Sequence, residues 1–406
     1  MLTEDEAYRR ILAAVSPLET EIVPLLDALG RFVATAHTAT HALPAFDNSA
    51  MDGYALAVDE RAGTLPAGTT LQVRGEQPAG PDRGLSVEPG GAVRIFTGGP
   101  VPAGAVAVVM QEDVDRTGDR IVLKEPVAAG EFIRRAGGDL ARGQRILEPG
   151  DRLTPGRLGL LASQGLAAVA VRRRPRVAVL ATGDELRAPG QALGPGEIYE
   201  SNGVLLATLA ATLGAQVMIL PRARDDRAEL DTRLAEGLAG HDALVVAGGV
   251  SVGERDFVKE RLAAAGVAPD LWRVRIKPGK PFLYGRAAGD GGAHVFGLPG
   301  NPVSAFVTFL LFVRPALLRM AGAREDALAL PAFPATAAVE LTNHGDRPHY
   351  LRGTLDARGV FAPGGQQESH ALFALSRSRA LVRVEAETVI PAGASLEALV
   401  WEAGGS

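Results

Sequence analysis

The chain has 406 residues, of which 47% are apolar and 22% are charged, and this composition excludes a mainly disordered protein. Lys and Arg number 42 and Asp and Glu number 47, so the net charge of −5 excludes a general basic surface for nucleic acid or anionic lipid. The absence of cysteine excludes disulfides, cysteine-ligated metal sites and thiol nucleophiles.

The N-terminal segment is predicted to be helical. Thr3 and Glu6 have the spacing of a capping box, and residues 8–15 carry apolar side chains at helical spacing. A second helix is predicted from Pro24 to Gly30, because Pro favours the first helical position and Gly the position after the last one.

No segment resembles a leader or a membrane span. The N-terminus is acidic, and the longest apolar stretch, 305–313, ends at Arg314-Pro315, well short of the roughly 20 residues that a span needs. We therefore expect a soluble, cytoplasmic protein.

Short apolar runs separated by Gly, Pro and Asp predict a β-rich domain at 47–146. Thr154-Pro155 then begins a predicted helix, and a strand is expected at 167–171. We expect this piece to pack with the N-terminal helices, so that 1–46 and 147–174 form one discontinuous domain. Residues 172–176 contain four arginines and are interpreted as a solvated basic hinge.

Strand and helix patterns alternate from residue 176 to about 320. Apolar runs predict strands at 177–181, 216–220, 243–247 and 294–297, and helices near 204–213, 229–238, 256–265 and 302–313. This alternation predicts an α/β domain with a mainly parallel sheet at 175–324. Short strands after Pro331 predict a C-terminal β domain at 325–406. The predicted fold class is therefore α/β plus β-rich modules.

Three of the predicted strands lead directly into unusual loops. These loops are Thr182-Gly183-Asp184-Glu185-Leu186, the stretch from Gly248 to Gly253, and Leu298-Pro299-Gly300-Asn301-Pro302. The carboxyl ends of parallel strands meet at one edge of a sheet, where ligands bind. The second and third loops lead into helices, so their N–H groups can hold an anion. None has the Walker A or GxGxxG pattern, so nucleotide binding of those kinds lacks support.

Charged side chains surround these loops. Lys277 and Lys280 lie in a Lys-Pro-Gly-Lys-Pro segment, and five carboxylates are nearby: Asp184, Glu185, Asp225, Asp226 and Asp256. Acids that hold a hard cation, beside lysines that balance phosphate charge, favour a magnesium-assisted phosphate reaction. Each carboxylate alone is better explained as a helix cap or an exposed charge, and the lysine segment equally well as a rigid turn. Convergence on one edge favours the functional interpretation.

The second loop also permits a hydrolase. The stretch from Gly249 to Gly253 matches the GxSxG nucleophile elbow, with Ser251 as the nucleophile. Histidines that follow it, His294, His344, His349 and His370, have the chain order of a triad partner. No HGGG-type oxyanion motif is present, so this alternative is the weaker one.

Six sequence blocks together resemble the molybdopterin molybdenumtransferase family, which comprises MoeA-type proteins and gephyrin E domains. The blocks are DNSAMDGYA from Asp47, RIFTGGPVPAGA from Arg94, ATGDEL from Ala181, GGVSVGERD from Gly248, IKPGKPF from Ile276 and GLPGNPVSAF from Gly297. The resemblance covers about residues 1–400. It implies an elongated, four-domain homodimer that transfers molybdate onto adenylylated molybdopterin and releases AMP in the presence of Mg²⁺. A molybdopterin adenylyltransferase is a further expected partner.

The resemblance also implies roles for individual residues. The metal and pyrophosphate would be served by Glu185, Asp225 and Asp256, and anionic oxygens by Lys277 and Lys280. Residues that would reach the site of the other subunit are Asp52, Thr97 and Asp139. Substrate-binding positions in the loop blocks are Thr182, Gly183, Gly249, Ser251, Pro299, Pro302 and Ser304. In the last domain, Arg352 and Ser369 resemble residues that line the molybdate pocket. As turn residues, Asp52, Thr97 and Asp139 also have a simpler structural interpretation.

Some positions depart from the family pattern, and two other functions stay open. Val106 replaces a polar residue, and Glu200, Gly203, His370 and the pair Ser378-Arg379 also differ from the common residues. These changes affect the details of the molybdate pocket. The alternatives are a molybdopterin adenylyltransferase, which would consume ATP, and a non-catalytic scaffold.

Overall fold

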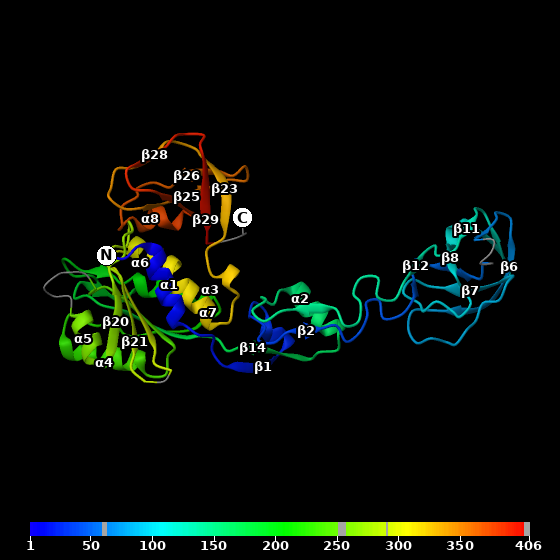
Figure 1. Cartoon of the computed structure of the whole chain (residues 1–406), viewed down its shortest axis with the longest axis horizontal. Coiled ribbons are helices and arrows are strands. Elements are labelled where there is room, and N and C mark those ends of the chain that lie inside the picture. The colour runs from blue at the N-terminus through cyan, green and yellow to red at the C-terminus, as the bar shows by residue number, and fades with distance from the viewer. Residues whose placement is uncertain (59–62, 251–256, 290, 402–406) are drawn as a thin grey trace. The chain divides into compact units, whose positions relative to one another are not determined.

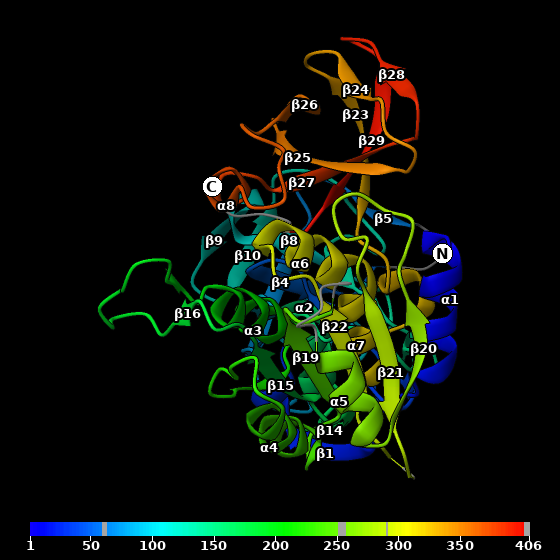
Figure 2. The same cartoon turned by 90° about the vertical axis from the view of Figure 1, so that its left-hand side faces the viewer.

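A six-stranded sheet forms the centre of the α/β region, with the strand order β18-β15-β19-β22-β21-β20. The computed structural model describes residues 1–58, 63–250, 257–289 and 291–401. Figure 2 shows the strands side by side. They are β15 (Arg176–Ala181), β18 (Gln216–Ile219), β19 (Ala243–Ala247), β20 (Val267–Trp272), β21 (Leu283–Ala287) and β22 (His294–Leu298).

Four of these strands are parallel, which confirms the predicted mainly parallel α/β domain. Strand β15 pairs in parallel with β18 and β19, and β19 pairs in parallel with β22. Strands β20 and β21 are antiparallel additions at the other edge, and the sequence analysis missed both.

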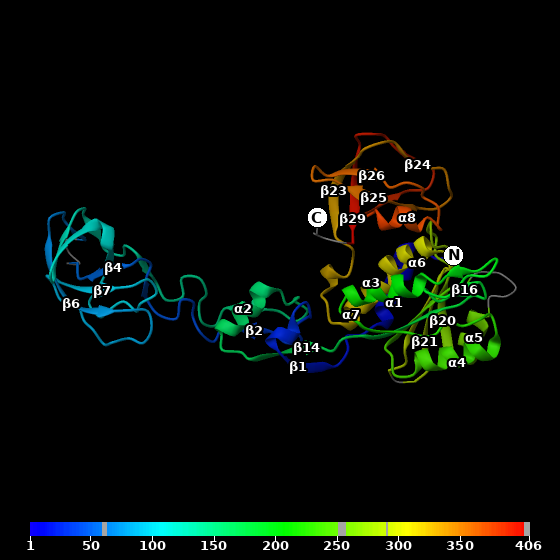
Figure 3. The same ribbon diagram turned by 180° about the vertical axis from the view of Figure 1, so that it is seen from behind.

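Alternate residues of the central strands face two different cores, as the two-residue period of a strand requires. Val177 and Val179 of β15 belong to one core cluster with Leu206 of α3, while Ala178 and Leu180 belong to another with Leu234 of α4. Figures 1 and 3 show α4 and α5 on one side of the sheet and α1, α3 and α6 on the other. The helix bounds are α1 (Glu4–Ala14), α3 (Asn202–Thr212), α4 (Arg227–Leu238), α5 (Val258–Ala264) and α6 (Pro302–Thr308).

The helix that follows β22 is longer than predicted. It continues through a π-helical turn, η3 (Phe309–Val313), into α7 (Arg314–Met320), so the predicted end near Val313 is wrong. Pro315 has no N–H and crowds the preceding turn, and the wider π turn immediately before it accommodates the ring. The 302–320 helix has the length and hydropathy of a membrane span, but 83% of its apolar window is buried in the core.

The N-terminal segment pairs with a distant part of the chain. Helix α1 has the predicted capping box between Thr3 and Glu6. The second predicted helix is wrong: strand β1 (Thr20–Pro24) pairs antiparallel with β14 (Ala168–Arg172), and only a 3-10 turn, η1 (Leu25–Ala28), follows it. The five residues between Pro24 and Gly30 are too few for a stable α-helix. Helix α2 (Pro155–Ser163) forms where Thr154-Pro155 predicts it.

The chain divides into two compact units. One contains Met1–Thr35, Pro149–Ala162 and Leu166–Ser406, and the other contains Ala36–Glu148 with Ser163–Gly165. The four domain ranges given by the sequence stay a prediction.

The second unit is β-rich, as predicted. Its main sheet has the order β8-β4-β7-β6-β10-β9. The strands are β4 (Gly53–Leu56), β6 (Thr70–Gln77), β7 (Gly91–Ile95), β8 (Ala107–Met110), β9 (Val114–Thr117) and β10 (Arg120–Leu123). Short pairs beside it are β3 (Asn48–Ser49) with β12 (Ile133–Arg134), β5 (Thr64–Leu65) with β11 (Val127–Ala128), and β2 (His37–Thr38) with β13 (Arg145–Leu147).

The C-terminal region is a closed barrel of five strands in the order β23-β26-β25-β27-β29. The strands are β23 (Ala332–Ala337), β25 (His349–Leu355), β26 (Val360–Pro363), β27 (Ala380–Val384) and β29 (Ser395–Val400), and helix α8 (Leu372–Ser376) lies between β26 and β27. Smaller strands are β16 (Leu186–Arg187), β17 (Ile198–Tyr199), β24 (Leu341–Asn343) and β28 (Thr388–Ile390).

Two sets of hydrogen bonds fasten the barrel to the α/β region. The N–H of Lys277 donates to the carbonyl of Pro348 at 2.8 Å, and the N–H of Tyr350 donates to the carbonyl of Lys277 at 2.7 Å. The buried Tyr350 hydroxyl also donates to the Glu4 carboxylate on α1, and Arg383 Nε donates to the same carboxylate at 3.3 Å. The lysine segment is thereby held directly against strand β25.

Two buried histidines make stability depend on pH. Burial lowers the pKa of His294 and of His349 from 6.5 to about 4. The Nδ1 atom of His294 lies 2.9 Å from the Tyr284 hydroxyl. Between pH 6.5 and pH 4 the unfolded chain therefore binds more protons than the folded chain. We expect each histidine to contribute up to about 3 kcal/mol to the free energy of unfolding. This contribution is present above pH 6.5 and is lost as the pH falls to 4. Urea unfolding midpoints at pH 7, 6, 5 and 4 measure this loss.

A matched pair of variants isolates the buried group. His294→Gln is expected to flatten the fall in midpoint between pH 7 and pH 5, whereas His344→Gln, which changes an exposed histidine, leaves the fall as it is. The assignment to His294 is wrong if both variants keep the slope of the unmodified protein.

Candidate functional site

The three loops meet at one edge of the sheet, as predicted, because β15, β19 and β22 are parallel. Backbone hydrogen bonds join them: Thr182 N–H donates to the carbonyl of Ala247 at 2.9 Å, and Gly248 N–H donates to that of Leu298 at 3.0 Å. Gly248 has a φ of +97°, and a Cβ there would come within 2.6 Å of the Thr182 carbonyl oxygen. Only glycine therefore allows the first two loops to approach this closely.

A cavity of about 670 Å³ lies over this edge, and we call it the sheet-edge cavity. All three loops contribute to its lining, together with the N-terminal end of α3. Among the predicted site residues, its lining includes Thr182, Gly183, Glu185, Asp225, Gly249, Pro299 and Pro302. The Thr182 hydroxyl is buried and has no hydrogen-bond partner among the residues that the structure describes. An unpaired polar group at a cavity wall is a ready contact for a polar ligand.

A second cavity, of about 600 Å³, adjoins the first, and we call it the lysine cavity. The two cavities share the lining residues Pro281, Pro299, Asn301 and His370. The predicted site residues in the lysine cavity are Lys277, Lys280, Pro299, Ser304 and Ser369.

Asn301 connects the two cavities to the C-terminal barrel. Its side-chain amide donates to the Ser369 hydroxyl at 2.8 Å, and the N–H of Val303 donates to the Ser369 carbonyl at 3.1 Å. The Leu298–Pro302 loop thus positions the hydroxyl of Ser369 as well as its own groups. Asn301 belongs to the GLPGNPVSAF block, and no role was predicted for it from the sequence.

His349 also lines the lysine cavity, beside the lysine segment to which its strand is paired. It is buried, and its Nε2 atom has no partner among the described residues. Burial is the main cause of its low pKa, and the charges of Lys277 and Arg352 lower the pKa further. The ring is therefore uncharged at neutral pH. The sequence analysis named His349 only as a triad histidine, and its place in this wall was not foreseen.

Arg352 is not among the lining residues of either cavity, and its place in a molybdate pocket stays a prediction. Its side chain is fully buried and donates to the carbonyl of Gln366 at 2.7 Å, while its N–H donates to Gln367 Oε1 at 2.9 Å. Burial lowers the pKa of its guanidinium. Arg352 therefore supports the segment that carries Ser369, instead of contacting the cavity itself.

The carboxylates differ in what they do. Asp226 caps α4 by accepting the N–H of Glu229 at 2.9 Å, which is the simpler interpretation offered by the sequence. Asp184 accepts the N–H of Asp225 at 3.1 Å and so orders the turn that carries Asp225. Glu185 and Asp225 face the sheet-edge cavity together with Glu200, which was noted only as a departure. Asp256 lies outside the described residues, as does Ser251.

The described carboxylates fit a magnesium site of limited size. Within the described ranges, no group of three or more His, Cys, Asp and Glu side chains is close enough to hold a metal ion. Mg²⁺ commonly uses one or two protein carboxylates and completes its shell with water and substrate phosphates. Glu185 and Asp225 both line the sheet-edge cavity, which is the number of carboxylates that such a site uses.

The predicted residues of the second unit are partly brought together. The Asp52 carboxylate accepts the N–H of Thr97 at 2.8 Å and its hydroxyl at 2.9 Å, and these bonds lower the pKa of Asp52. Asp139 is exposed in another loop, where its N–H donates to the carbonyl of Leu43 at 2.9 Å. The Asp52–Thr97 contact is compatible with a turn as well as with a site.

The hydrolase alternative gains no support from His294. This residue begins β22, while the loops follow the last residue of that strand, Leu298. Four strand steps place the two ends about 13 Å apart. His294 is also occupied by its contact with the Tyr284 hydroxyl.

Known proteins are similar to this chain in sequence and in architecture. Residues 2–165 match the MoeA N-terminal region (domain I and II), 178–319 a probable molybdopterin binding domain, and 334–401 the MoeA C-terminal region (domain IV). Molybdopterin molybdenumtransferase 2 of Mycobacterium tuberculosis is 37% identical over 94% of both chains, and molybdopterin molybdenumtransferase of Haemophilus influenzae is 37% identical over 95% of both. A solved MoeA structure from Pyrococcus horikoshii covers 100% of both chains with a TM-score of 0.82 and 27% identity. The chain belongs to the molybdopterin molybdenumtransferase family.

Proposed function

We propose that this chain inserts molybdate into adenylylated molybdopterin and releases AMP. Membership of the family gives it a role in molybdenum cofactor biosynthesis as a transferase. The observation that carries the specific proposal is the adjoining pair of cavities, one lined by carboxylates and the other by lysines. A phosphate-bearing substrate and a tetrahedral oxyanion need these two environments side by side.

The sheet-edge cavity would hold the adenylylated end of the substrate. Glu185 and Asp225 would hold Mg²⁺, which when bound neutralises charge on the phosphoanhydride oxygens. The loop N–H groups near Gly249 and the hydroxyl of Thr182 would donate to phosphate oxygens. Asp256 would add a further carboxylate.

The lysine cavity would hold molybdate. Lys277 and Lys280 would attract the dianion, while the hydroxyls of Ser304 and Ser369 would orient it. Two Mo–S bonds form, and one oxide leaves as water with the two thiol protons. One water is consumed when the phosphoanhydride breaks and AMP departs, so the exchange balances.

We also propose a homodimer in which Asp52, Thr97 and Asp139 complete the site of the other subunit. This proposal rests on the family resemblance and on the Asp52–Thr97 contact. A cytoplasmic location and handover from a molybdopterin adenylyltransferase are parts of the same proposal.

Release of AMP is expected to depend on molybdate and on both lysines. Lys277→Ala and Lys280→Ala are each expected to lower the rate about 100-fold, because each removes a charged donor from the oxyanion. Quantifying AMP by chromatography, with and without molybdate, measures this. Lys124→Ala, an exposed lysine of the second unit, is the control with an unchanged rate.

The adenylyltransferase alternative gives a different result in the same assay. It requires consumption of ATP with unmodified molybdopterin in the absence of molybdate. Consumption of ATP, together with a rate of AMP release that does not depend on molybdate, would contradict molybdate insertion.

Neighbouring aspartates test the metal site. Asp225→Asn is expected to raise the Mg²⁺ concentration for half-maximal AMP release about tenfold or more, since one anionic ligand is lost. Asp226→Asn should leave this concentration unchanged, because Asn caps a helix about as well as Asp. A chelator of Mg²⁺ should abolish AMP release in the unmodified protein and in both variants. Equal magnesium curves for the two variants would place the metal elsewhere.

Mixing two inactive variants tests the shared site. Asp52→Ala and Lys277→Ala chains co-expressed with different tags form mixed dimers that contain one intact site. The purified mixture is expected to recover about a quarter of the unmodified activity, given random pairing of subunits in a two-fold dimer. Absence of any recovery in purified mixed dimers would show that Asp52 serves its own chain.

A further inference from the structure

The arginine run at 172–176 is not simply a solvated hinge, as the sequence suggested. Arg172 and Arg174 line a cavity of about 180 Å³ together with Arg31 and Arg152, and we call it the arginine cavity. Arg173 completes five arginines in the lining, which contains no Asp or Glu. The chain as a whole carries a net charge of −5, so this is a local concentration of positive charge against the general trend.

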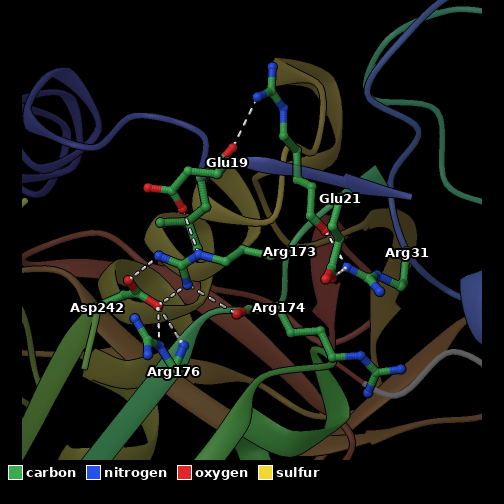
Figure 4. Close-up of polar contacts among 9 residues, drawn as sticks. Glu19, Glu21, Arg31, Arg173, Arg174, Arg176 and Asp242 are labelled. Carbon is green, nitrogen blue, oxygen red and sulfur yellow. Dashed lines mark hydrogen bonds and ion pairs between the residues drawn. The ribbon is translucent and has the colours of Figure 1, made fainter. Parts of the chain in front are cut away.

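Two of the five arginines are neutralised beside the cavity. Arg173 donates to both carboxylate oxygens of Asp242, at 2.6 and 2.7 Å, and to Glu19 at 2.6 Å. Arg31 is paired with Glu21. Figure 4 shows the Arg173–Asp242 pair and the Arg31–Glu21 pair, with the side chain of Arg174 pointing away from Asp242.

The other three arginines have no carboxylate partner within the described part of the chain. Arg172 Nη1 donates to the carbonyl of Leu18 at 3.0 Å, and Arg152 Nε donates to that of Gly30 at 3.4 Å. No side-chain hydrogen bond or ion pair of Arg174 is found among the described residues. Three guanidinium charges therefore border one small space, each with most of its five donors unused.

A second observation concerns the hydrogen bonds of Arg31, which also lines the arginine cavity. Its side chain is only 9% exposed, and its Nε atom is buried without a hydrogen-bond partner among the described residues. Its Nη2 is already used by Glu21 and by the Arg172 carbonyl at 2.7 Å. A buried unpaired donor on a charged group is costly, and Arg31 lines the cavity, so an acceptor bound beside Arg31 would reduce this cost.

We propose that the arginine cavity binds a small phosphate-type oxyanion. Guanidinium groups present paired N–H donors that match the oxygens of phosphate. Pockets for drug-sized ligands have volumes of about 300–1,000 Å³, so this cavity suits one or two phosphate groups and not a whole nucleotide. It shares no lining residue with the sheet-edge or lysine cavity, so it is a separate site and does not depend on the proposed reaction.

The location gives the bound anion a structural effect. The lining comes from the end of η1, from the link between β14 and β15, and from the last turn of α3 with Gly214. An anion there would join the β1–β14 pair to the α/β region through shared hydrogen bonds. By mass action it would raise the melting temperature of the protein, and the rise would grow with the logarithm of the anion concentration once that exceeds the dissociation constant.

The test uses full-length protein with the lysine cavity disabled. In a Lys277→Ala, Lys280→Ala background, pyrophosphate and phosphate are titrated at constant ionic strength by calorimetry, with molybdate as a third probe. We expect saturable binding of one pyrophosphate per chain. Arg152→Ala or Arg174→Ala should weaken it about tenfold each, since each removes a charge-assisted contact. Arg358→Ala, an exposed arginine of the barrel, is the matched control.

Two further measurements keep the result clear. Melting curves without anion should coincide for all variants, and Arg174→Lys should bind with intermediate strength because it keeps the charge but loses the paired donors. The proposal is overturned by absence of saturable binding at millimolar pyrophosphate, or by arginine variants that bind like Arg358→Ala. Neither outcome bears on molybdate insertion, because the background already lacks the two lysines.

Discussion

The parallel alignment of β15, β19 and β22 is the constraint on which the site depends. Because their carboxyl ends coincide, the loops at Thr182, Gly248 and Leu298 emerge together, and backbone hydrogen bonds join each to the next strand end. The close approach is possible because Gly248 carries no side chain toward the Thr182 carbonyl. The backbone of this edge therefore fixes the positions from which Thr182, Glu185 and Asp225 line the cavity.

The second constraint is the backbone pairing of Lys277 with strand β25. Lysine side chains are long and mobile, so their charge is useful at a defined place only if their backbone is fixed. The bonds to Pro348 and Tyr350 fix it from the barrel side, and the contacts of Tyr350 and Arg383 with Glu4 extend the attachment to α1. The barrel also supplies Ser369, which Asn301 ties to the sheet-edge loop. The lysine cavity is therefore a property of two regions held together, and neither contains it alone.

The sequence predicted the parts of this arrangement that depend on short-range patterns. Apolar runs such as 177–181 and 243–247 located the buried strands, and the loops after them followed from strand direction. The predictions from sequence were wrong where tertiary packing determines the local structure. A proline such as Pro315 usually ends a helix, yet here the helix continues past it through a π turn. Residues 20–24 form a strand because β14 lies beside them. The roles of Arg352 and His349 depend on which wall of the barrel faces the lysines, and no local pattern contains that information.

Charge at the three cavities is controlled in different ways, so the anion sites that we propose differ in what neutralises the anion. At the sheet edge, Glu185 and Asp225 line the cavity, and the Mg²⁺ that we propose there would offset carboxylate charge beside the phosphate. In the lysine cavity, His349 stays uncharged because burial and the neighbouring cations disfavour its protonation. The charged lining residues are then the two lysines and Arg347, with Glu368 as the one carboxylate. In the arginine cavity, Asp242 and Glu19 draw Arg173 away while Arg152, Arg172 and Arg174 keep their charge unpaired. The sign at each place is thus set by how the surrounding acids are paired, and the net charge of the chain does not predict it.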